Sequence, residues 1–215
     1  MYTAGDIKHA MHLYAVTDRA WLGGRSLAEC VRDAIAGGAT FVQLREKHAS
    51  FDEAFKLAQE IMPICARARV PFVIDDDVEL ACACGADGVH VGQSDMACAK
   101  ARAVLGPEKI VGVSVQTLKQ ALAAERDGAS YLGVGAMIAT STKPDAQVVS
   151  AQTLAEICTS VSIPVVAIGG LNEHTLGVLA GTGVDGVAVV SALFAASNIK
   201  QAALTLSTTI SETLR

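Results

Sequence analysis

Eight short apolar runs recur along the chain, and they limit its fold more than any other feature. Each run is rich in Val, Ile and Leu, as in Phe72–Ile74 and Gly88–Val91. Such runs are typical of strands buried on both faces, as parallel strands are when helices cover the sheet. The predicted strands span residues 13–17, 41–45, 72–74, 88–91, 110–114, 131–135, 165–169 and 186–190.

The segments between these runs have the periodicity of helices. Apolar residues recur three and four positions apart in 26–36, 51–68, 117–127 and 151–160. Several of the next strands are entered through glycine, as in GGATFV from residue 37. Eight strand–helix units predict a TIM (β/α)8 barrel that forms a single domain over residues 1–215, since an open doubly wound sheet needs fewer strands.

Composition and charge exclude several classes of protein. The net charge of −5 argues against a basic nucleic-acid groove. The longest stretch without a formal charge has 16 residues, 157–172, and contains a proline, so we expect no transmembrane helix. The first ten residues carry charges and no apolar signal core. The six cysteines form no C-x-x-C pair, so we expect reduced thiols and a cytoplasmic protein.

In a barrel of this kind, functional side chains follow the C-terminal ends of the strands. Arg45 ends the second predicted strand and Lys47 follows it, Asp76 follows the third strand, Asp95 the fourth and Lys143 the sixth. Carboxylates on neighbouring strand ends favour a hard cation such as Mg²⁺, which fills its other positions with phosphate oxygens and water. The basic residues then favour a diphosphate.

Two further acids have a simpler interpretation. Asp77 and Glu79 fit the solvated start of a helix, where negative charge is favourable.

A second phosphate site is predicted after the seventh and eighth strands. One strand ends in Gly169 and Gly170 and the other in Val190 and Ser191, and small residues there let backbone amides approach a monophosphate. The glycine pair also fits a helix entry without a ligand. One diphosphate held by a metal and one monophosphate suggest a transferase that joins two phosphorylated molecules.

Seven motifs in this order resemble the thiamine-phosphate synthase family. They are YAVTDR (14–19), VQLREK (42–47), ADGVHVGQSDM (86–96), GVSVQT (112–117), TSTK (140–143), PVVAIGGL (164–171) and GVAVVSA (186–192). The resemblance implies that the chain joins hydroxymethylpyrimidine diphosphate to hydroxyethylthiazole phosphate, releases pyrophosphate and uses Mg²⁺. Its partners would be these small molecules, without nucleic acid or membrane, and a homo-oligomer is left open.

The resemblance also implies a role for each matching residue. Gln43 would orient the pyrimidine. The catalytic residues around the diphosphate would be Arg45, Lys47, Ser114 and Lys143, and the metal ligands Asp76 and Asp95. The residues binding the thiazole phosphate would be Thr140, Thr142, Gly170, Val190 and Ser191.

Asp75 departs from the family pattern, because an Asn is usual at this substrate-binding position. An ionised Asp only accepts hydrogen bonds, so Asp75 must be protonated, bind the metal or repel the diphosphate. We expect metal binding.

Three alternatives stay open. A thiazole tautomerase of the same superfamily has a His two residues after the strand-five Ser, where this chain has Gln116. A Schiff-base aldolase would use Lys47 or Lys143. A non-catalytic phosphate-binding barrel would keep Gly170 and Ser191 without needing the acids. His90, within a predicted strand, is expected to be a hydrogen-bonded barrel residue.

Overall fold

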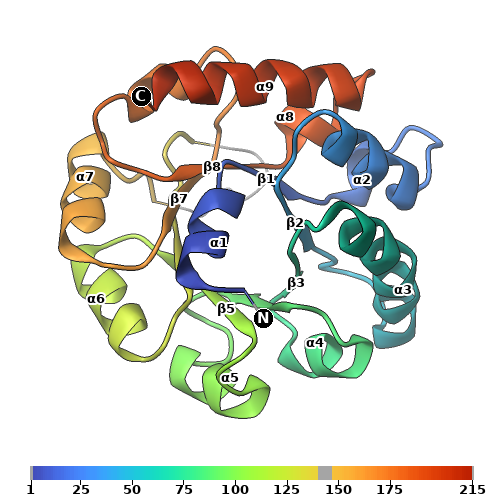
Figure 1. Cartoon of the computed structure of the whole chain (residues 1–215), viewed down its shortest axis with the longest axis horizontal. Helices are drawn as coiled ribbons and strands as arrows, with labels where there is room; N and C mark the ends of the chain where they lie inside the picture. Colours follow the sequence, from blue (N-terminus) through green and yellow to red (C-terminus); the bar gives the residue numbers. More distant parts are fainter. Residues whose placement is uncertain (1, 140–146, 215) are drawn as a thin grey trace.

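Eight parallel strands close into a barrel in a computed structural model, which describes residues 2–139 and 147–214 (Figure 1). Neighbours in sequence pair in order, and β1 pairs with β8 to complete the ring. The strands are β1 (Leu13–Val16), β2 (Phe41–Leu44), β3 (Phe72–Asp75), β4 (Gly88–Val91), β5 (Ile110–Val115), β6 (Tyr131–Val134), β7 (Val165–Ile168) and β8 (Gly186–Val189). All eight predicted strands and the predicted barrel are confirmed.

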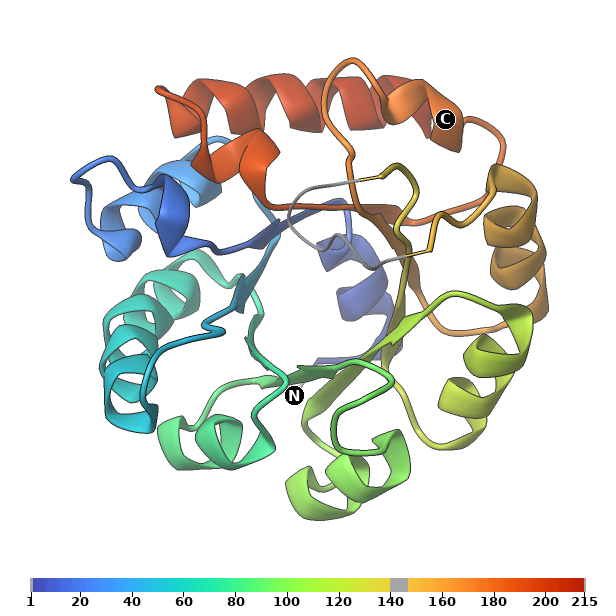
Figure 2. The same cartoon turned by 180° about the vertical axis from the view of Figure 1, so that it is seen from behind.

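Helices cover the outside of this barrel (Figures 1 and 2). They are α2 (Leu27–Ala36), α3 (Phe51–Ala68), α4 (Val78–Cys84), α5 (Cys98–Leu105), α6 (Leu118–Arg126), α7 (Ala151–Ser160), α8 (Ser191–Phe194) and α9 (Ile199–Thr213). Capping boxes start two of them, where Ser26 pairs with Glu29 and Ser50 with Glu53. The four helical segments predicted from periodicity are confirmed.

The connection between β7 and β8 differs from the regular strand–helix repeat. It contains a short 3-10 helix, η2 (Leu176–Leu179), rather than an α-helix. Gly177, Gly181 and Gly183 lie in this segment, and the last two have φ of 74° and 78°. Glycine is a poor helix former, and a left-handed residue ends a helix. Helix α9 packs against both η2 and α2.

A short helix, α1 (Ala4–Ala10), closes the N-terminal end of the barrel and is seen in front of its centre in Figure 1. Its Ile7 and Ala10 pack on a cluster inside the barrel that includes Tyr14, Phe41 and Tyr131. A larger apolar cluster lies between the strands and the surrounding helices. Because α1 fills one end, the site must lie at the other, where the strands end.

The cysteines are distributed over five of the helices. All six cysteines lie in helices and are free thiols, and Cys82 is exposed whereas Cys84 is buried. Within residues 2–139 and 147–214, no helix is long and apolar enough to cross a membrane.

Candidate active site

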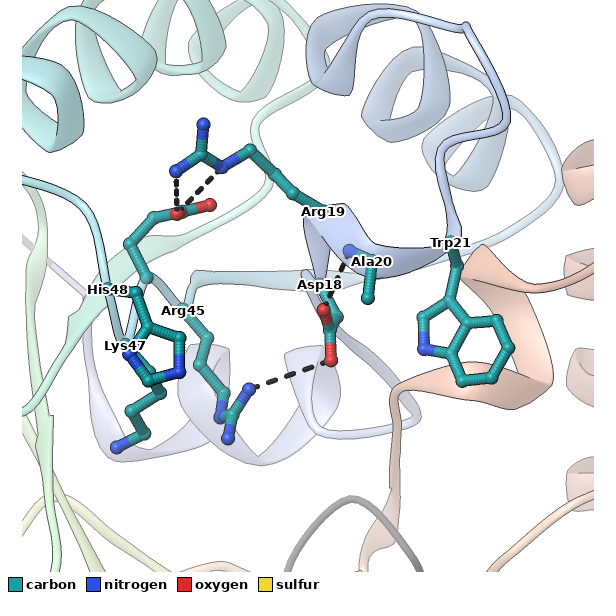
Figure 3. A pocket seen from close by; sticks show the side chains of 8 residues that line it. Asp18, Arg19, Ala20, Trp21, Arg45, Lys47 and His48 are labelled. Carbon is teal, nitrogen blue, oxygen red and sulfur yellow. Dashed lines mark hydrogen bonds and ion pairs between the residues drawn. The ribbon is translucent and has the colours of Figure 1, made fainter.

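Lys47 brings together the aspartate that ends β3 and the aspartate that follows it. Its Nζ lies 3.1 Å from Oδ2 of Asp75 and also contacts Oδ2 of Asp76. Arg45 lies beside them, with Nε 3.8 Å from Oδ2 of Asp75 and Nη1 3.7 Å from Oδ2 of Asp18. Arg45 and Lys47, two of the basic residues predicted for the diphosphate, therefore stand among acids, and Figure 3 shows Arg45 pointing toward Asp18.

The three consecutive aspartates have three different environments. Asp75 ends β3, and its side chain is only 10% exposed. Asp76 turns the chain with φ of 62°, a left-handed conformation that Asp tolerates better than most residues. Asp77 is the N-cap of α4, where its side chain accepts a hydrogen bond from the backbone N–H of Leu80 at 2.8 Å. The prediction that Asp77 starts a helix is confirmed.

The charges of Lys47 and Asp75 depend on one another. Burial raises the pKa of Asp75, and Lys47 and Arg45 offset part of this effect. Partial burial alone would lower the pKa of Lys47, but Asp75 and Asp76 reverse this and raise it. The ammonium of Lys47 therefore stays charged at neutral pH, and it partly neutralises the two aspartates beside it.

Asp95 reaches the same place from the end of β4. The backbone N–H of Gly92 donates a hydrogen bond to its Oδ2 at 2.7 Å. Partial burial and contact with the Asp76 carboxyl both raise the pKa of Asp95. Two carboxyls in contact repel each other when both are ionised, and a dication between them removes that repulsion.

This pair of acids fits Mg²⁺. Among residues 2–139 and 147–214, no three His, Cys, Asp or Glu side chains gather closely enough to hold an ion alone. Mg²⁺ is commonly held by one or two carboxylates together with substrate phosphates and water, so the two carboxyls of Asp76 and Asp95 match the number that this ion takes.

A cavity of about 590 Å³ opens beside these residues, between the segments that follow β1 and β2 (Figure 3). Its lining residues are Asp18, Arg19, Ala20, Trp21, Arg45, Glu46, Lys47 and His48. Arg19 and Glu46 form an ion pair in its wall, with Nη2 and Oε2 2.7 Å apart. Trp21 is 42% exposed, so the cavity offers both charge and an aromatic surface.

Gln43 and Ser114 lie deeper in the barrel. The Nε2 of Gln43 donates to the phenol oxygen of Tyr14 at 3.0 Å. The Oγ of Ser114 lies 2.8 Å from Nε2 of His90, whose Nδ1 lies 2.8 Å from the phenol oxygen of Tyr131. The prediction that His90 is a hydrogen-bonded barrel residue is confirmed.

Three residues predicted for the monophosphate, Gly170, Val190 and Ser191, follow β7 and β8, which pair with each other. Gly170 has φ of 69°, and a Cβ there would lie 2.7 Å from Cβ of Ile138, so only glycine fits. Val190 precedes α8, and Ser191 is the first residue of that helix. Thr140, Thr142 and Lys143 lie outside the described residues.

Sequence reasoning missed three residues of this region. Asp18 follows β1 just as the other acids follow their strands, so the same rule applied to the first strand finds it. Tyr14 and Tyr131 lie in apolar strands, where their only signal is a phenol that needs a hydrogen-bond partner once buried.

The matches to known proteins cover nearly the whole barrel. A family model described as thiamine monophosphate synthase matches residues 13–193. Thiamine-phosphate synthase of Clostridium acetobutylicum is 49% identical over 191 residues, which are 89% of this chain and 90% of that one. The synthase of Chloroflexus aurantiacus is 48% identical, covering 94% of this chain and 93% of the other.

A solved structure agrees with these matches. The thiamine phosphate pyrophosphorylase of Pyrococcus furiosus superposes with a TM-score of 0.89 at 38% identity, over 97% of this chain and 100% of that one. The chain therefore belongs to the thiamine monophosphate synthase family.

Proposed function

We propose that this transferase condenses hydroxymethylpyrimidine diphosphate with hydroxyethylthiazole phosphate, with Mg²⁺ as its cofactor. The observation that carries the proposal is the contact of Lys47 with Asp76, whose carboxyl stands near enough to Asp95 to raise the pKa of that side chain. This arrangement suits a metal-bound diphosphate, because the lysine can pair with the phosphate oxygens and the two acids can pair with the metal ion.

The reaction separates charge at one carbon–oxygen bond. The bond between the pyrimidine methylene carbon and the diphosphate oxygen breaks, and its electron pair leaves with pyrophosphate. The electron-rich aminopyrimidine delocalises the positive charge left on the carbon. The nitrogen of the thiazole then donates its lone pair to that carbon and forms the new bond. Holding the two rings close replaces a bimolecular encounter with an intramolecular step.

The chain's residues support this separation of charge. Lys47 and Arg45 would bind the diphosphate oxygens and stabilise the negative charge that grows on them. Asp76 and Asp95 would hold Mg²⁺, which supplies further positive charge to the leaving group. Gln43 would orient the pyrimidine, and Ser114 and Lys143 would complete the diphosphate site.

The thiazole phosphate would bind where β7 and β8 end. Gly170, Val190 and Ser191 would contact it, together with Thr140 and Thr142. We further propose that residues 1–215 act as a single domain in the cytoplasm, with the small-molecule substrates as partners and without nucleic acid or membrane.

Mixing both phosphorylated precursors with Mg²⁺ tests the proposed reaction. Thiamine phosphate and pyrophosphate should appear in equal amounts, and leaving out either precursor or adding a chelator should stop both. Isomerisation of the thiazole without condensation would indicate a tautomerase, although Gln116 stands where that enzyme has a His. Trapping of a substrate on lysine by borohydride would indicate an aldolase.

Asp75→Asn is expected to raise the Mg²⁺ concentration needed for half-maximal rate and to leave kcat at saturating Mg²⁺ within a few-fold. The change removes negative charge beside Asp76. It also removes a partner 3.1 Å from Lys47, which then competes more strongly with the metal for Asp76. Initial rates across a Mg²⁺ titration, at saturating substrates, measure the effect. An unchanged Mg²⁺ requirement with a lower KM for the diphosphate would show that Asp75 repels the substrate instead.

A further inference from the structure

Five polar side chains on five strands are joined end to end inside the barrel. The Nε2 of Gln43 lies 3.0 Å from the oxygen of Tyr14, and that oxygen lies 2.7 Å from the oxygen of Tyr131. The oxygen of Tyr131 lies 2.8 Å from Nδ1 of His90, and Nε2 of His90 lies 2.8 Å from Oγ of Ser114. This hydrogen-bonded series of side chains thus begins at Gln43 and ends at Ser114, which are both proposed to bind substrate. The three residues between them have no proposed contact with substrate.

The first donor sets the direction of every later bond. An amide nitrogen only donates, so the Tyr14 oxygen accepts from Gln43 and turns its own proton toward Tyr131. Tyr131 then donates to Nδ1 of His90. A neutral imidazole that accepts at Nδ1 carries its proton on Nε2, so His90 donates to Ser114.

This order determines what Ser114 offers to a ligand. Its oxygen accepts from His90, so its hydroxyl proton is free to be donated elsewhere. In the opposite order, Ser114 would donate to His90 and would present only lone pairs to the site. Diphosphate oxygens accept hydrogen bonds and do not donate them, so only the first order suits an anionic substrate.

The residues packed around these five hydrogen-bonded side chains hold them in place. Tyr14 and Tyr131 are at most 2% exposed, and burial raises the pKa of both phenols, so each keeps its proton. A Cβ at Gly112 would lie 2.2 Å from the ring of Tyr131, and one at Gly133 would lie 3.1 Å from the ring of His90. These two glycines therefore give the rings the space that the bonds require. A buried network with its members paired favours one arrangement.

We propose that Tyr14, Tyr131 and His90 are positioning residues that fix the Ser114 hydroxyl as a hydrogen-bond donor to the diphosphate, in an order set by the Gln43 amide. The role of Ser114 rests on the proposed function. The order of donors, however, belongs to the free protein and is testable without substrate.

Nitrogen NMR of the histidine rings reads that order directly. In protein labelled with ¹⁵N, the neutral ring of His90, assigned with a His90→Gln variant, should carry its proton on Nε2 alone. Tyr131→Phe removes the donor to Nδ1, and Gln43→Met removes the donor that orients the tyrosines. In each of these two variants, the neutral ring of His90 should populate both of its tautomers. If Tyr131→Phe does not fold, Gln43→Met provides the same measurement.

Measurements of kcat test whether the order of hydrogen-bond donors affects catalysis. Tyr131→Phe should lower kcat by about tenfold, because a misplaced group reduces the fraction of well-aligned complexes. Phe41→Leu is the matched control, since its ring packs on both tyrosines at centroid distances of 4.4 and 5.5 Å without any hydrogen-bonding atom. This control should keep the Nε2 proton and its kcat.

Two results would overturn the inference. One is a proton on Nδ1 of His90 in the unchanged protein, and the other is a Tyr131→Phe variant that keeps a single tautomer and full kcat. Failure to form thiamine phosphate would instead contradict the proposed function and leave the NMR result standing.

Discussion

Asp76→Asn should lower kcat/KM by about a thousandfold while the barrel keeps its fold. The proposed role of Asp76 is to hold Mg²⁺ against the leaving pyrophosphate together with Asp95, and an amide lacks the charge for this. The fold should tolerate the change because Asp76 is 31% exposed and its left-handed conformation also suits Asn. Steady-state rates and circular dichroism measure the two effects, and calorimetric titration with Mn²⁺ measures metal binding without turnover.

Asp77→Asn is the control, because it removes the same charge one residue further along. Asp77 caps α4, and Asn caps a helix about as well as Asp. Activity and Mn²⁺ affinity should both be retained in this variant. An equal loss in both variants would mean that the site responds only to overall charge. Full Mn²⁺ affinity in Asp76→Asn would remove Asp76 from the metal site.

The barrel was predictable because strands that are buried on both faces have continuous apolar sequences. Runs such as Val165–Ile168 are continuous and apolar, and glycine separates several of them from the preceding helix. The parts that were not predicted depend on other forces. Helix α1 has seven residues, and its place across the barrel end comes from packing against the interior cluster. The 3-10 helix after β7 reflects glycines that interrupt an otherwise apolar segment.

For the site, it was predictable that the charged residues at the strand ends would lie near one another. Parallel strands place their C-terminal ends on one edge, so Lys47, Asp76 and Asp95 were expected together, and the structure places them together. Side-chain pairing was not predictable. The ion pair between Lys47 and Asp75 depends on how the side chains are oriented, and the bond between Tyr14 and Tyr131 joins residues 117 positions apart. Neither leaves a local pattern.

Lys47→Met should lower kcat by about a hundredfold, the scale expected for one charged group that stabilises a leaving group. Lys47 now contacts the oxygens of Asp75 and Asp76, but a diphosphate brings more negative charge and should draw the ammonium toward itself. Steady-state kinetics with the pyrimidine diphosphate varied should show the loss in kcat. Lys56→Met, an exposed site on α3, makes the same substitution away from the site and should leave kcat unchanged.

The same variant should bind Mn²⁺ more tightly when no substrate is present. The ammonium of Lys47 and a metal ion compete for Asp76, so removing one partner frees the carboxylate for the other. Lys47 is 41% exposed, and a partly exposed ion pair contributes about 1 kcal/mol or less, so the gain in affinity should be at most about fivefold. In the Asp76→Asn background the gain should disappear, because the contested ligand is gone. A loss of kcat without any gain in Mn²⁺ affinity would mean that Lys47 serves the diphosphate alone. A gain that persists without Asp76 would assign the competition to Asp75 and make it the third ligand of the metal.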